Sequence, residues 1–188
     1  PEKYETNMRA YLRMISGVDH VIGRIVDALE EQGLADNTVI LYMGDNGYYM
    51  GERGFAGKWS HYDESLRVPL IVHDPRMPRS AQGHVPEEIA LNLDVPELML
   101  RSGGVEVPDL YQSRNLRPLV RRGSADSWRN DFFCEHLMDH PAIPKWEGVR
   151  GTRYKYARYF EQDPPYEFLH DLEEDPKELK NFAEDPEY

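Results

Sequence analysis

The sequence predicts an α/β protein followed by a small antiparallel α+β subdomain, on three observations. Apolar residues recur at helical spacing from about residue 4 to residue 31. A short β-branched apolar run, residues 38–43, follows, and this order of elements is half of a βαβ unit. From Asn130 onward, short aromatic segments alternate with Pro, Gly and Asp, which is typical of antiparallel strands. We therefore predict domains at residues 1–127 and 128–188.

The first predicted helix and strand place a loop at a ligand-binding edge. Gly33 follows the last helical turn, where a left-handed C-cap is expected. The strand at residues 38–43 is almost wholly apolar, as in strands buried on both faces of a parallel sheet. The loop after Met43 then lies at the carboxyl end of a strand, where open α/β sheets bind ligands.

Further elements follow this loop. Ser60 and Asp63 predict a capping box for a short helix. Residues 67–73 read as a second strand, and Pro69 places its first residues at a sheet edge or before pairing starts.

The middle of the chain is less regular. Residues 89–100 predict a helix that starts or breaks near Pro96. Residues 102–127 are rich in Gly and Pro and are expected to be irregular.

The C-terminal region predicts a sheet of about four strands, near residues 131–136, 148–152, 154–159 and 166–170. Alternation along the third strand places Arg153 and Lys155 on one face. We expect this face to be solvated, with the basic residues paired to the acidic residues Glu173, Glu174 and Asp175.

Composition narrows the possible functions. The formal net charge is −12, from 34 acidic and 22 basic residues, which argues against nucleic acid as a partner. An anionic substrate would need a local cation. No apolar run approaches the ~20 residues of a membrane span. The single cysteine, Cys134, excludes an internal disulfide and reads as a core residue.

The loop after residue 43 concentrates chemically useful groups. Asp45 and Asn46 present adjacent oxygen ligands of the kind that Ca²⁺ or Mg²⁺ prefers, although two protein ligands are too few for a complete site. A glycine-rich segment can fold Lys58 back toward them, and an ammonium beside a metal suits a tetrahedral oxyanion. On local sequence alone, the Asp-Asn-Gly run is equally an ordinary turn.

Residues 18–72 contain an ordered series of short motifs: Val18-Asp19, Gly23, Gly33–Thr38, Asp45-Asn46-Gly47, Gly51-Glu52, Gly57-Lys58-Trp59, Glu64-Ser65 and Arg67–Leu70. In this order they resemble the type I sulfatases of the alkaline-phosphatase superfamily. The tail "LHDLEEDPKELKNFA" also resembles the sulfatase C-terminal subdomain. The resemblance implies the C-terminal portion of an alkaline-phosphatase-like sandwich, followed by that subdomain.

The resemblance assigns roles to individual residues. It implies that Asp45 and Asn46 ligate a divalent cation, usually calcium and alternatively magnesium, and that Lys58 contacts the substrate sulfate. Related enzymes place a Glu-His pair near the substrate cleft at the position of Glu135 and His136.

A histidine close to the loop is a further candidate for the site. His61 is the histidine nearest this site in sequence and is a candidate substrate contact.

The family nucleophile is a formylglycine made from a Cys or Ser in a Cys/Ser-x-Pro-x-Arg motif, and this sequence contains no such motif. Cys134 is followed by Glu-His-Leu-Met and does not match it. Because the chain starts at Pro1, we interpret it as a piece of a longer chain or a processed product, and we expect it to be inactive alone. The resemblance favours a periplasmic or secreted parent protein.

Three functional hypotheses stay open. The parent protein hydrolyses sulfate esters of a sugar or of a small aryl or alkyl alcohol, or it hydrolyses phosphonate or phosphate esters with the same residues. Alternatively, the chain is a non-catalytic module that binds anions or carbohydrate. An incomplete sheet exposes an apolar edge, so we expect the isolated chain to self-associate or to be marginally stable.

Overall fold

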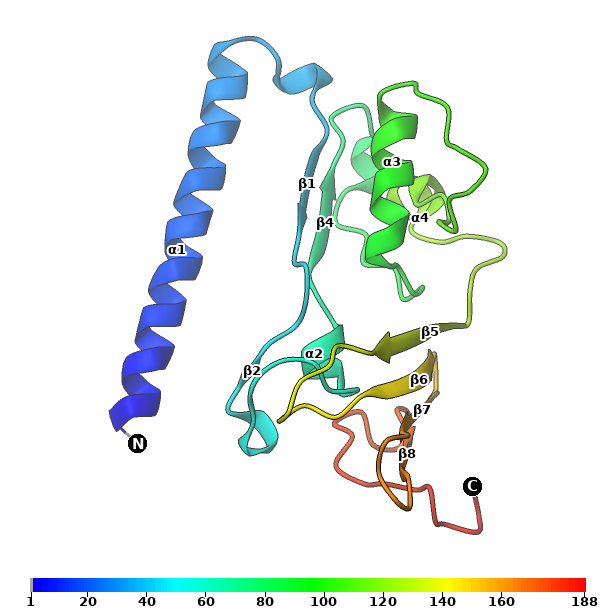
Figure 1. Cartoon of the computed structure of the whole chain (residues 1–188). Coiled ribbons are helices and arrows are strands. Elements are labelled where there is room, and N and C mark those ends of the chain that lie inside the picture. The colour runs from blue at the N-terminus through cyan, green and yellow to red at the C-terminus, as the bar shows by residue number, and fades with distance from the viewer. Residues whose placement is uncertain (1) are drawn as a thin grey trace. The chain divides into compact units, whose positions relative to one another are not determined.

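A computed structural model describes residues 2–188 (Figure 1). The chain forms two compact units, one from residues up to 43 together with 70–82, the other from residues 44–69 together with 83–188. The boundary predicted between residues 127 and 128 falls inside the second unit and stays a prediction.

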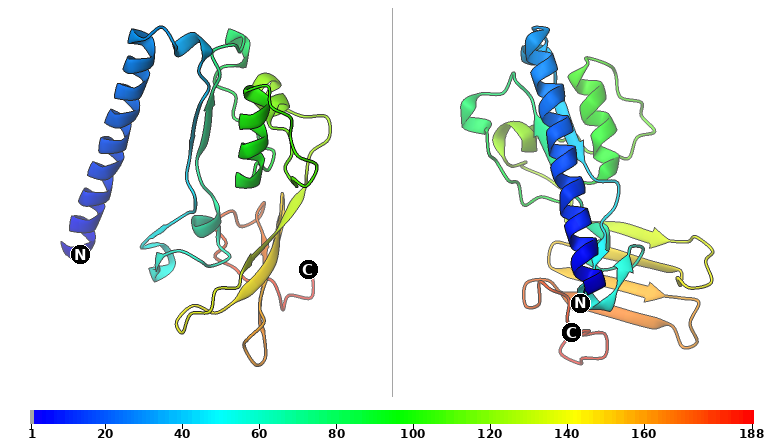
Figure 2. Two further views of the ribbon diagram at one scale, coloured as in Figure 1. Left: turned by 45° about the horizontal axis from the view of Figure 1, so that its top comes forward. Right: turned by 90° about the vertical axis from the view of Figure 1, so that its left-hand side faces the viewer.

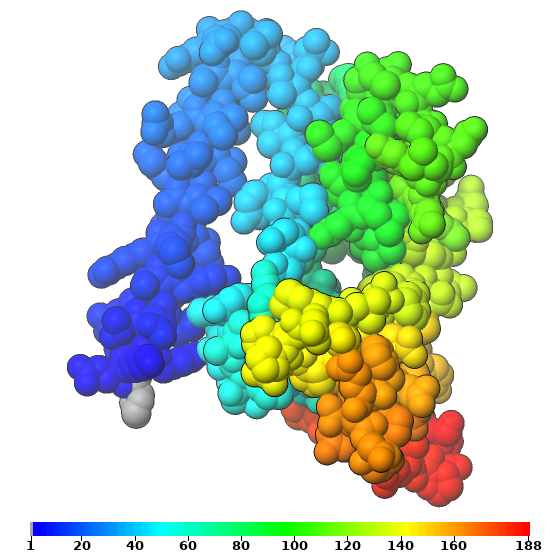
Figure 3. Space-filling view, viewed as in Figure 1, coloured from blue at the N-terminus to red at the C-terminus, as the bar shows by residue number. Residues whose placement is uncertain are grey.

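The first unit begins with α1, Glu2–Glu31, which confirms the predicted long helix. The Gly33 amide donates to the Glu30 carbonyl at 3.0 Å, and Gly33 has a φ of 67°, as the predicted left-handed cap requires. No residue of α1 is buried, and Figure 3 shows its side chains (blue) at the surface on the face in view. None of the helices within residues 2–188 is long and apolar enough to cross a membrane.

Two strands complete the first unit, β1 (Ile40–Met43) and β4 (Leu70–His73). They pair antiparallel, with Met43 opposite Leu70. The parallel pairing expected for the first strand is therefore wrong for this pair, and β1 is not buried on both faces. β4 starts at the end where β1 finishes, so the chain needs no crossover back along the sheet. β4 begins directly after Pro69, as predicted.

The second unit opens with the loop that contains Lys58. Strands β2 (Tyr49–Met50) and β3 (Ala56–Gly57) pair antiparallel and enclose a 3₁₀ turn, η2 (Glu52–Gly54). Of the other 3₁₀ turns, η1 (Ala35–Asn37) and η3 (Arg79–Ala81) belong to the first unit, and η4 (Asn92–Asp94) belongs to the second.

A short helix, α2 (Asp63–Leu66), follows the loop, but the predicted capping box is wrong. Tyr62 occupies the N-cap position and makes no side-chain cap. The Ser60 hydroxyl instead bonds the Tyr49 hydroxyl, and the Asp63 carboxylate accepts from Lys155. Both side chains thus serve tertiary contacts, which no local pattern reveals.

The middle of the second unit contains two helices. α3 (Val95–Ser102) has Pro96 in its first turn, as predicted. The preceding Asp94 is fully buried and binds the Arg129 guanidinium, which anchors the helix start. The segment 102–127 contains α4 (Arg117–Arg122), so its predicted irregularity is wrong there. Six residues are too few to show a helical period in the sequence.

The predicted four-stranded antiparallel sheet is confirmed. Its strands pair in chain order, as Figure 2 shows (right): β5 (Asp131–His136), β6 (Trp146–Gly151), β7 (Tyr154–Tyr159) and β8 (Tyr166–Asp171). Trp146, Ala157 and Tyr159 form its core. Cys134 packs against this core, and burial raises the pKa of its thiol to about 11, in keeping with a structural cysteine.

Candidate functional site

The glycine-rich loop of residues 47–59, called the Lys58 loop below, folds back so that Lys58 contacts Asn46. The Lys58 Nζ donates a 2.6 Å hydrogen bond to the Asn46 Oδ1. The Asn46 Nδ2 in turn donates to the Gly47 carbonyl at 2.7 Å, which fixes the orientation of the carboxamide. The structure therefore brings together the lysine and the asparagine that the sequence predicted to meet.

Much of this loop has left-handed backbone. Gly51, Gly54 and Gly57 have φ values of 116°, 75° and 94°. Arg53 and Trp59 also have positive φ, at 56° and 85°, where a side chain costs about 1–3 kcal/mol each. Such a conformation persists only when the surroundings hold it.

Ser65, buried in α2, holds both ends of the loop. Its carbonyl accepts from the Gly47 amide at 2.9 Å, and its hydroxyl accepts from the Trp59 amide at 2.8 Å. The Trp146 indole donates to the Trp59 carbonyl at 2.7 Å. Only glycine fits at position 47, because an added Cβ would lie 2.1 Å from the Glu64 carbonyl oxygen. These contacts fix the two backbone segments that present Asn46 and Lys58.

Asp45 offers its side chain to solvent. Its carbonyl accepts from the Asn92 Nδ2 at 3.1 Å, which anchors the backbone, while the residue is exposed. Carboxylate and amide oxygens are the ligands that Ca²⁺ and Mg²⁺ prefer. Within residues 2–188, no group of three or more His, Cys, Asp or Glu side chains could enclose a metal ion. Asp45 and Asn46 thus fit a divalent cation by ligand type, but the described residues do not form a complete site around them.

The predicted Glu-His pair is divided between two faces of β5. The His136 ring stacks on Trp59, with centroids 5.9 Å apart and planes at 16°. Burial and the neighbouring His140 lower the pKa of His136, and its Nε2 is buried without a hydrogen-bond partner among the described residues. Glu135 is exposed and, by strand alternation, points to the opposite face. Of this pair, the structure brings only His136 to the Lys58 loop.

His61 is not placed as predicted. Its side chain is 1% exposed, so it has no surface to offer a substrate. Its Nδ1 lies 2.9 Å from the Tyr159 hydroxyl, and its Nε2 lies 3.1 Å from the Nε2 of His170. The expectation of a substrate contact at His61 is therefore not supported, because the ring packs inward against β7 and β8.

The two histidines form a chain of hydrogen bonds with one consistent set of protons. The His170 Nδ1 faces the Lys180 carbonyl at 2.8 Å, so this nitrogen must donate and the His170 Nε2 must accept from His61. The His61 Nδ1 then accepts from Tyr159. Both rings are neutral in this arrangement, and burial lowers the pKa of His61 to about 2 and also lowers that of His170.

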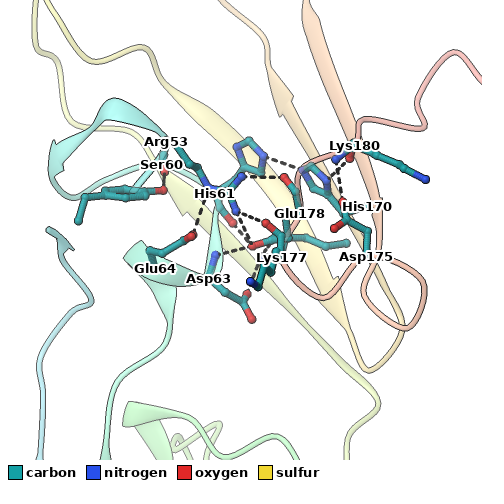
Figure 4. A network of polar contacts seen from close by, with 12 residues as sticks. Arg53, Ser60, His61, Asp63, Glu64, His170, Asp175, Lys177, Glu178 and Lys180 are labelled. Atoms are coloured by element: carbon teal, nitrogen blue, oxygen red, sulfur yellow. Dashed lines mark hydrogen bonds and ion pairs between the residues drawn. The ribbon is translucent and has the colours of Figure 1, made fainter. Parts of the chain in front are cut away.

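Lys155 and Glu178 form a buried ion pair that the sequence did not indicate (Figure 4). The Lys155 Nζ also donates to the Asp63 carboxylate at 2.5 Å and to the His61 carbonyl at 3.1 Å. The expected solvated face containing Lys155 is thus wrong, whereas Arg153 does pair with Glu173, and with Asp171. Lys155 lies on the same strand face as the buried residues Ala157 and Tyr159, and this two-residue spacing was the signal in the sequence for its burial.

Comparisons with known proteins agree with this structure. A family model described as sulfatase matches residues 1–99, and one described as N-sulphoglucosamine sulphohydrolase, C-terminal, matches residues 51–188. The chain is 33% identical, over 99% of its length, to an N-acetylglucosamine-6-O-sulfatase of Bacteroides thetaiotaomicron. It is 31% identical, over 95% of its length, to an arylsulfatase of Clostridium perfringens.

Solved structures are similar as well. One, a complex with its substrate D-glucosamine-2-N,6-O-disulfate, matches 99% of the chain with a TM-score of 0.90 and 31% identity. A phosphonate monoester hydrolase of Agrobacterium radiobacter matches 93% with a TM-score of 0.79 and 31% identity. The chain spans 34–38% of the length of the two sulfatase relatives and of the substrate complex. It belongs to the sulfatase family of the alkaline-phosphatase superfamily and corresponds to the family's C-terminal part.

Proposed function

We propose that the protein containing this chain hydrolyses the sulfate ester of a sugar, with Lys58 contacting the sulfate. The observation that supports this most is the hydrogen bond between Lys58 Nζ and Asn46 Oδ1. It joins a half-buried ammonium to Asn46, one of the two proposed cation ligands, in a chain similar to an N-acetylglucosamine-6-O-sulfatase. The substrate class proposed is therefore a sulfated sugar such as N-acetylglucosamine 6-sulfate.

Lys58 would act by neutralising charge. Sulfuryl transfer accumulates negative charge on the sulfate oxygens, and a donor fixed before the reaction stabilises that charge without reorganising. Asn46 and the clamped backbone of Trp59 hold the lysine in place. A divalent cation held by Asp45 and Asn46, calcium or magnesium, would polarise the sulfate as a Lewis acid. A formylglycine nucleophile would have to come from outside these residues, because none of them forms the motif.

The sugar would lie toward Trp59 and His136. Trp59 is exposed and follows Lys58 directly, and its ring stacks on His136. The Nε2 of His136 is buried without a partner among the described residues, so the sugar would meet the exposed Trp59 ring and not this nitrogen. Glu135 points away and takes no part in this proposal as placed here.

The test is release of inorganic sulfate from N-acetylglucosamine 6-sulfate by the complete gene product that contains this sequence. The proposal expects turnover that a chelator abolishes and that Lys58→Ala lowers by about 10²–10³-fold in kcat. Lys3→Ala, a change on the exposed face of α1, is the matched control and should leave turnover unchanged. Full turnover by the Lys58 variant would contradict the role given to this lysine.

Hydrolysis of phosphonate or phosphate esters is the second candidate. The similarity to a phosphonate monoester hydrolase at a TM-score of 0.79 favours it, since Lys58 and a cation would suit a phosphoryl group equally. Comparing kcat/KM for a sulfate ester and a phosphonate monoester of the same alcohol decides between them. Binding of sulfated sugar without turnover of either ester would leave the non-catalytic module.

The isolated 188 residues should be inactive. They provide two cation ligands and the lysine but contain no Cys/Ser-x-Pro-x-Arg motif. Incubation of the purified chain with an aryl sulfate should release no product above the rate of a Lys58→Ala sample, and turnover above that rate would overturn this expectation.

A further inference from the structure

We infer that Glu178 and Arg53 are positioning residues, through which the C-terminal segment 177–180 sets the conformation of the Lys58 loop. This inference rests on the proposed function for its catalytic consequence. Its structural part stands on the contacts of Figure 4, which join residues more than 100 positions apart in the sequence.

Backbone strain is the first observation. Among residues 2–188, the non-glycine residues with positive φ are Arg53, Trp59 and Glu178. Two of them flank Lys58 in the loop, and the third belongs to the C-terminal segment that contacts the loop. Strained backbone that clusters in this way must be held by tertiary contacts, and it is most common at functional sites.

The Arg53 guanidinium joins the two segments. It donates to the carbonyls of Lys177 at 2.5 Å and of Glu178 at 2.7 Å. Its Nε donates to Glu64 at 3.3 Å, and its plane lies over the Tyr62 ring at 3.9 Å. Arginine supplies this planar fork of donors, whereas lysine would supply only a point charge.

The Glu178 side chain makes a second connection, from the C-terminal segment to the start of α2. It is buried, and its Oε2 accepts from the Asp63 amide at 2.8 Å, at the first residue of α2. Its Oε1 forms an ion pair with Lys155, whose Nζ also binds the Asp63 carboxylate. Glu178 therefore fixes the start of α2 both directly and through Lys155.

The path from α2 to the site is short. Ser65 of α2 binds the backbone of Gly47, next to Asn46, and of Trp59, next to Lys58. A shift of α2 would therefore move the backbone that presents both Asn46 and Lys58. Misplacing a catalytic group by about 1 Å costs about 100-fold in rate.

The experiment compares Glu178→Gln and Arg53→Lys with Glu184→Gln in the complete protein. Glu184 is an exposed residue of the same C-terminal region and is not among the residues that bind Arg53, Lys155 or Glu178. Hydrogen exchange of the amides in residues 47–59 should rise at least 10-fold in both test variants. Exchange in β5–β8 should stay at the wild-type rate, as should all exchange in the Glu184 control. Arg53→Lys serves as the second variant if Glu178→Gln does not fold.

A kinetic cycle separates positioning from general stability. Glu178→Gln should lower kcat/KM for the sulfate ester about 100-fold in the wild-type background. It should have almost no effect when Lys58 is already alanine, because Glu178 acts through that lysine.

Two outcomes would overturn the inference: unchanged exchange in residues 47–59, or an undiminished 100-fold loss in the Lys58→Ala background. A wild-type protein without sulfatase activity would refute the proposed function instead, while the exchange result would still decide the structural part.

Discussion

Two lysines of the second unit differ in the burial and in the partners of their ammonium groups. Lys58 is half-buried, and its Nζ donates to Asn46 and lies over the Trp59 ring, 5.6 Å from its centroid. Lys155 is 1% exposed and binds two carboxylates and a carbonyl. The first ammonium can bind a ligand, whereas the second has its donors engaged within the fold.

The difference indicates where the order of the site originates. The loop around Lys58 has strained backbone at Arg53 and Trp59, and contacts with α2 and the C-terminal segment hold it. The junction around Lys155 is buried and thoroughly paired, and it connects α2, β7, β8 and the C-terminal segment. We therefore infer that the buried contacts around Lys155 hold the loop that presents Lys58, and the changes below test this inference.

Lys155→Met should give the largest loss of stability. Removing Lys155 leaves the buried Glu178 carboxylate with the more distant Arg53 guanidinium at 3.9 Å, and leaves Asp63 with Arg150 at 3.2 Å. Loss of the central cation costs about 3–5 kcal/mol of unfolding free energy. Lys58→Met should change it by less than about 0.5 kcal/mol. Urea titrations followed by tryptophan fluorescence report on the second unit, where all three tryptophans lie. Equal losses for the two variants would remove the distinction between the lysines.

Gly47→Ala should come next, at about 1–3 kcal/mol. Its Cβ would collide with the Glu64 carbonyl oxygen, which is backbone and cannot move aside easily. Gly57→Ala is the matched comparison, because its Cβ meets nothing within 4 Å and only its φ of 94° is unfavourable, at about 1–2 kcal/mol. The same titration measures both, and a larger loss at Gly57 would show that the contact with α2 is not what holds the loop.

Acid should loosen the junction through His61 and His170. Burial lowers the pKa of both rings, so the folded state binds fewer protons than the unfolded state once the pH falls below about 6.5. The stabilisation is complete above that pH and declines below it, by about 1.4 kcal/mol per pH unit for the His61 ring, and His170 adds a decline in the same direction. Lys155, Arg53 and Glu178 are the charged groups facing the pair.

The measurement is the unfolding free energy at pH 7.5, 6.5 and 5.5. The paired carboxylate Asp171, whose pKa the Arg153 hydrogen bonds lower to about 2, adds acid sensitivity only below about pH 4. His20→Gln, on exposed α1, should keep the wild-type slope. A free energy that does not change between pH 7.5 and 5.5 would exclude the neutral histidine chain.

The smallest expected effect concerns self-association of the isolated chain. α1 exposes an apolar stripe that includes Met14, Ile15 and Val18, and none of its residues is buried. Two copies can cover such a face, so the apparent mass in sizing chromatography should rise with concentration. Ile15→Lys should reduce the rise and Arg13→Gln should not. A monomer at every concentration would contradict this expectation.

The sequence predicted elements best where the signal was local. The periodicity of α1, the four aromatic segments of the sheet and Pro96 at the start of α3 each report on neighbouring residues. The return of Lys58 to Asn46 was also expected, from the glycines between them.

The errors involve contacts across long distances in the sequence. His61 and Lys155 are polar residues that usually lie at the surface, and only their partners, His170 and Glu178, explain their burial. The antiparallel pairing of β1 with β4 depends on where the intervening loop returns. Glu135 and His136 point to opposite faces because neighbouring strand residues alternate, so the predicted strand already implied this split. Which of the two faces the loop depends on a distant contact, the stacking of His136 on Trp59.

The most direct test of the account is a structure of the complete protein with N-acetylglucosamine 6-sulfate bound. The account predicts a sulfate oxygen within about 2.7–3.2 Å of the Lys58 Nζ, a cation on Asp45 and Asn46, and the sugar toward Trp59 and His136. A sulfate bound elsewhere, with the Lys58 Nζ still turned only to Asn46, would contradict it.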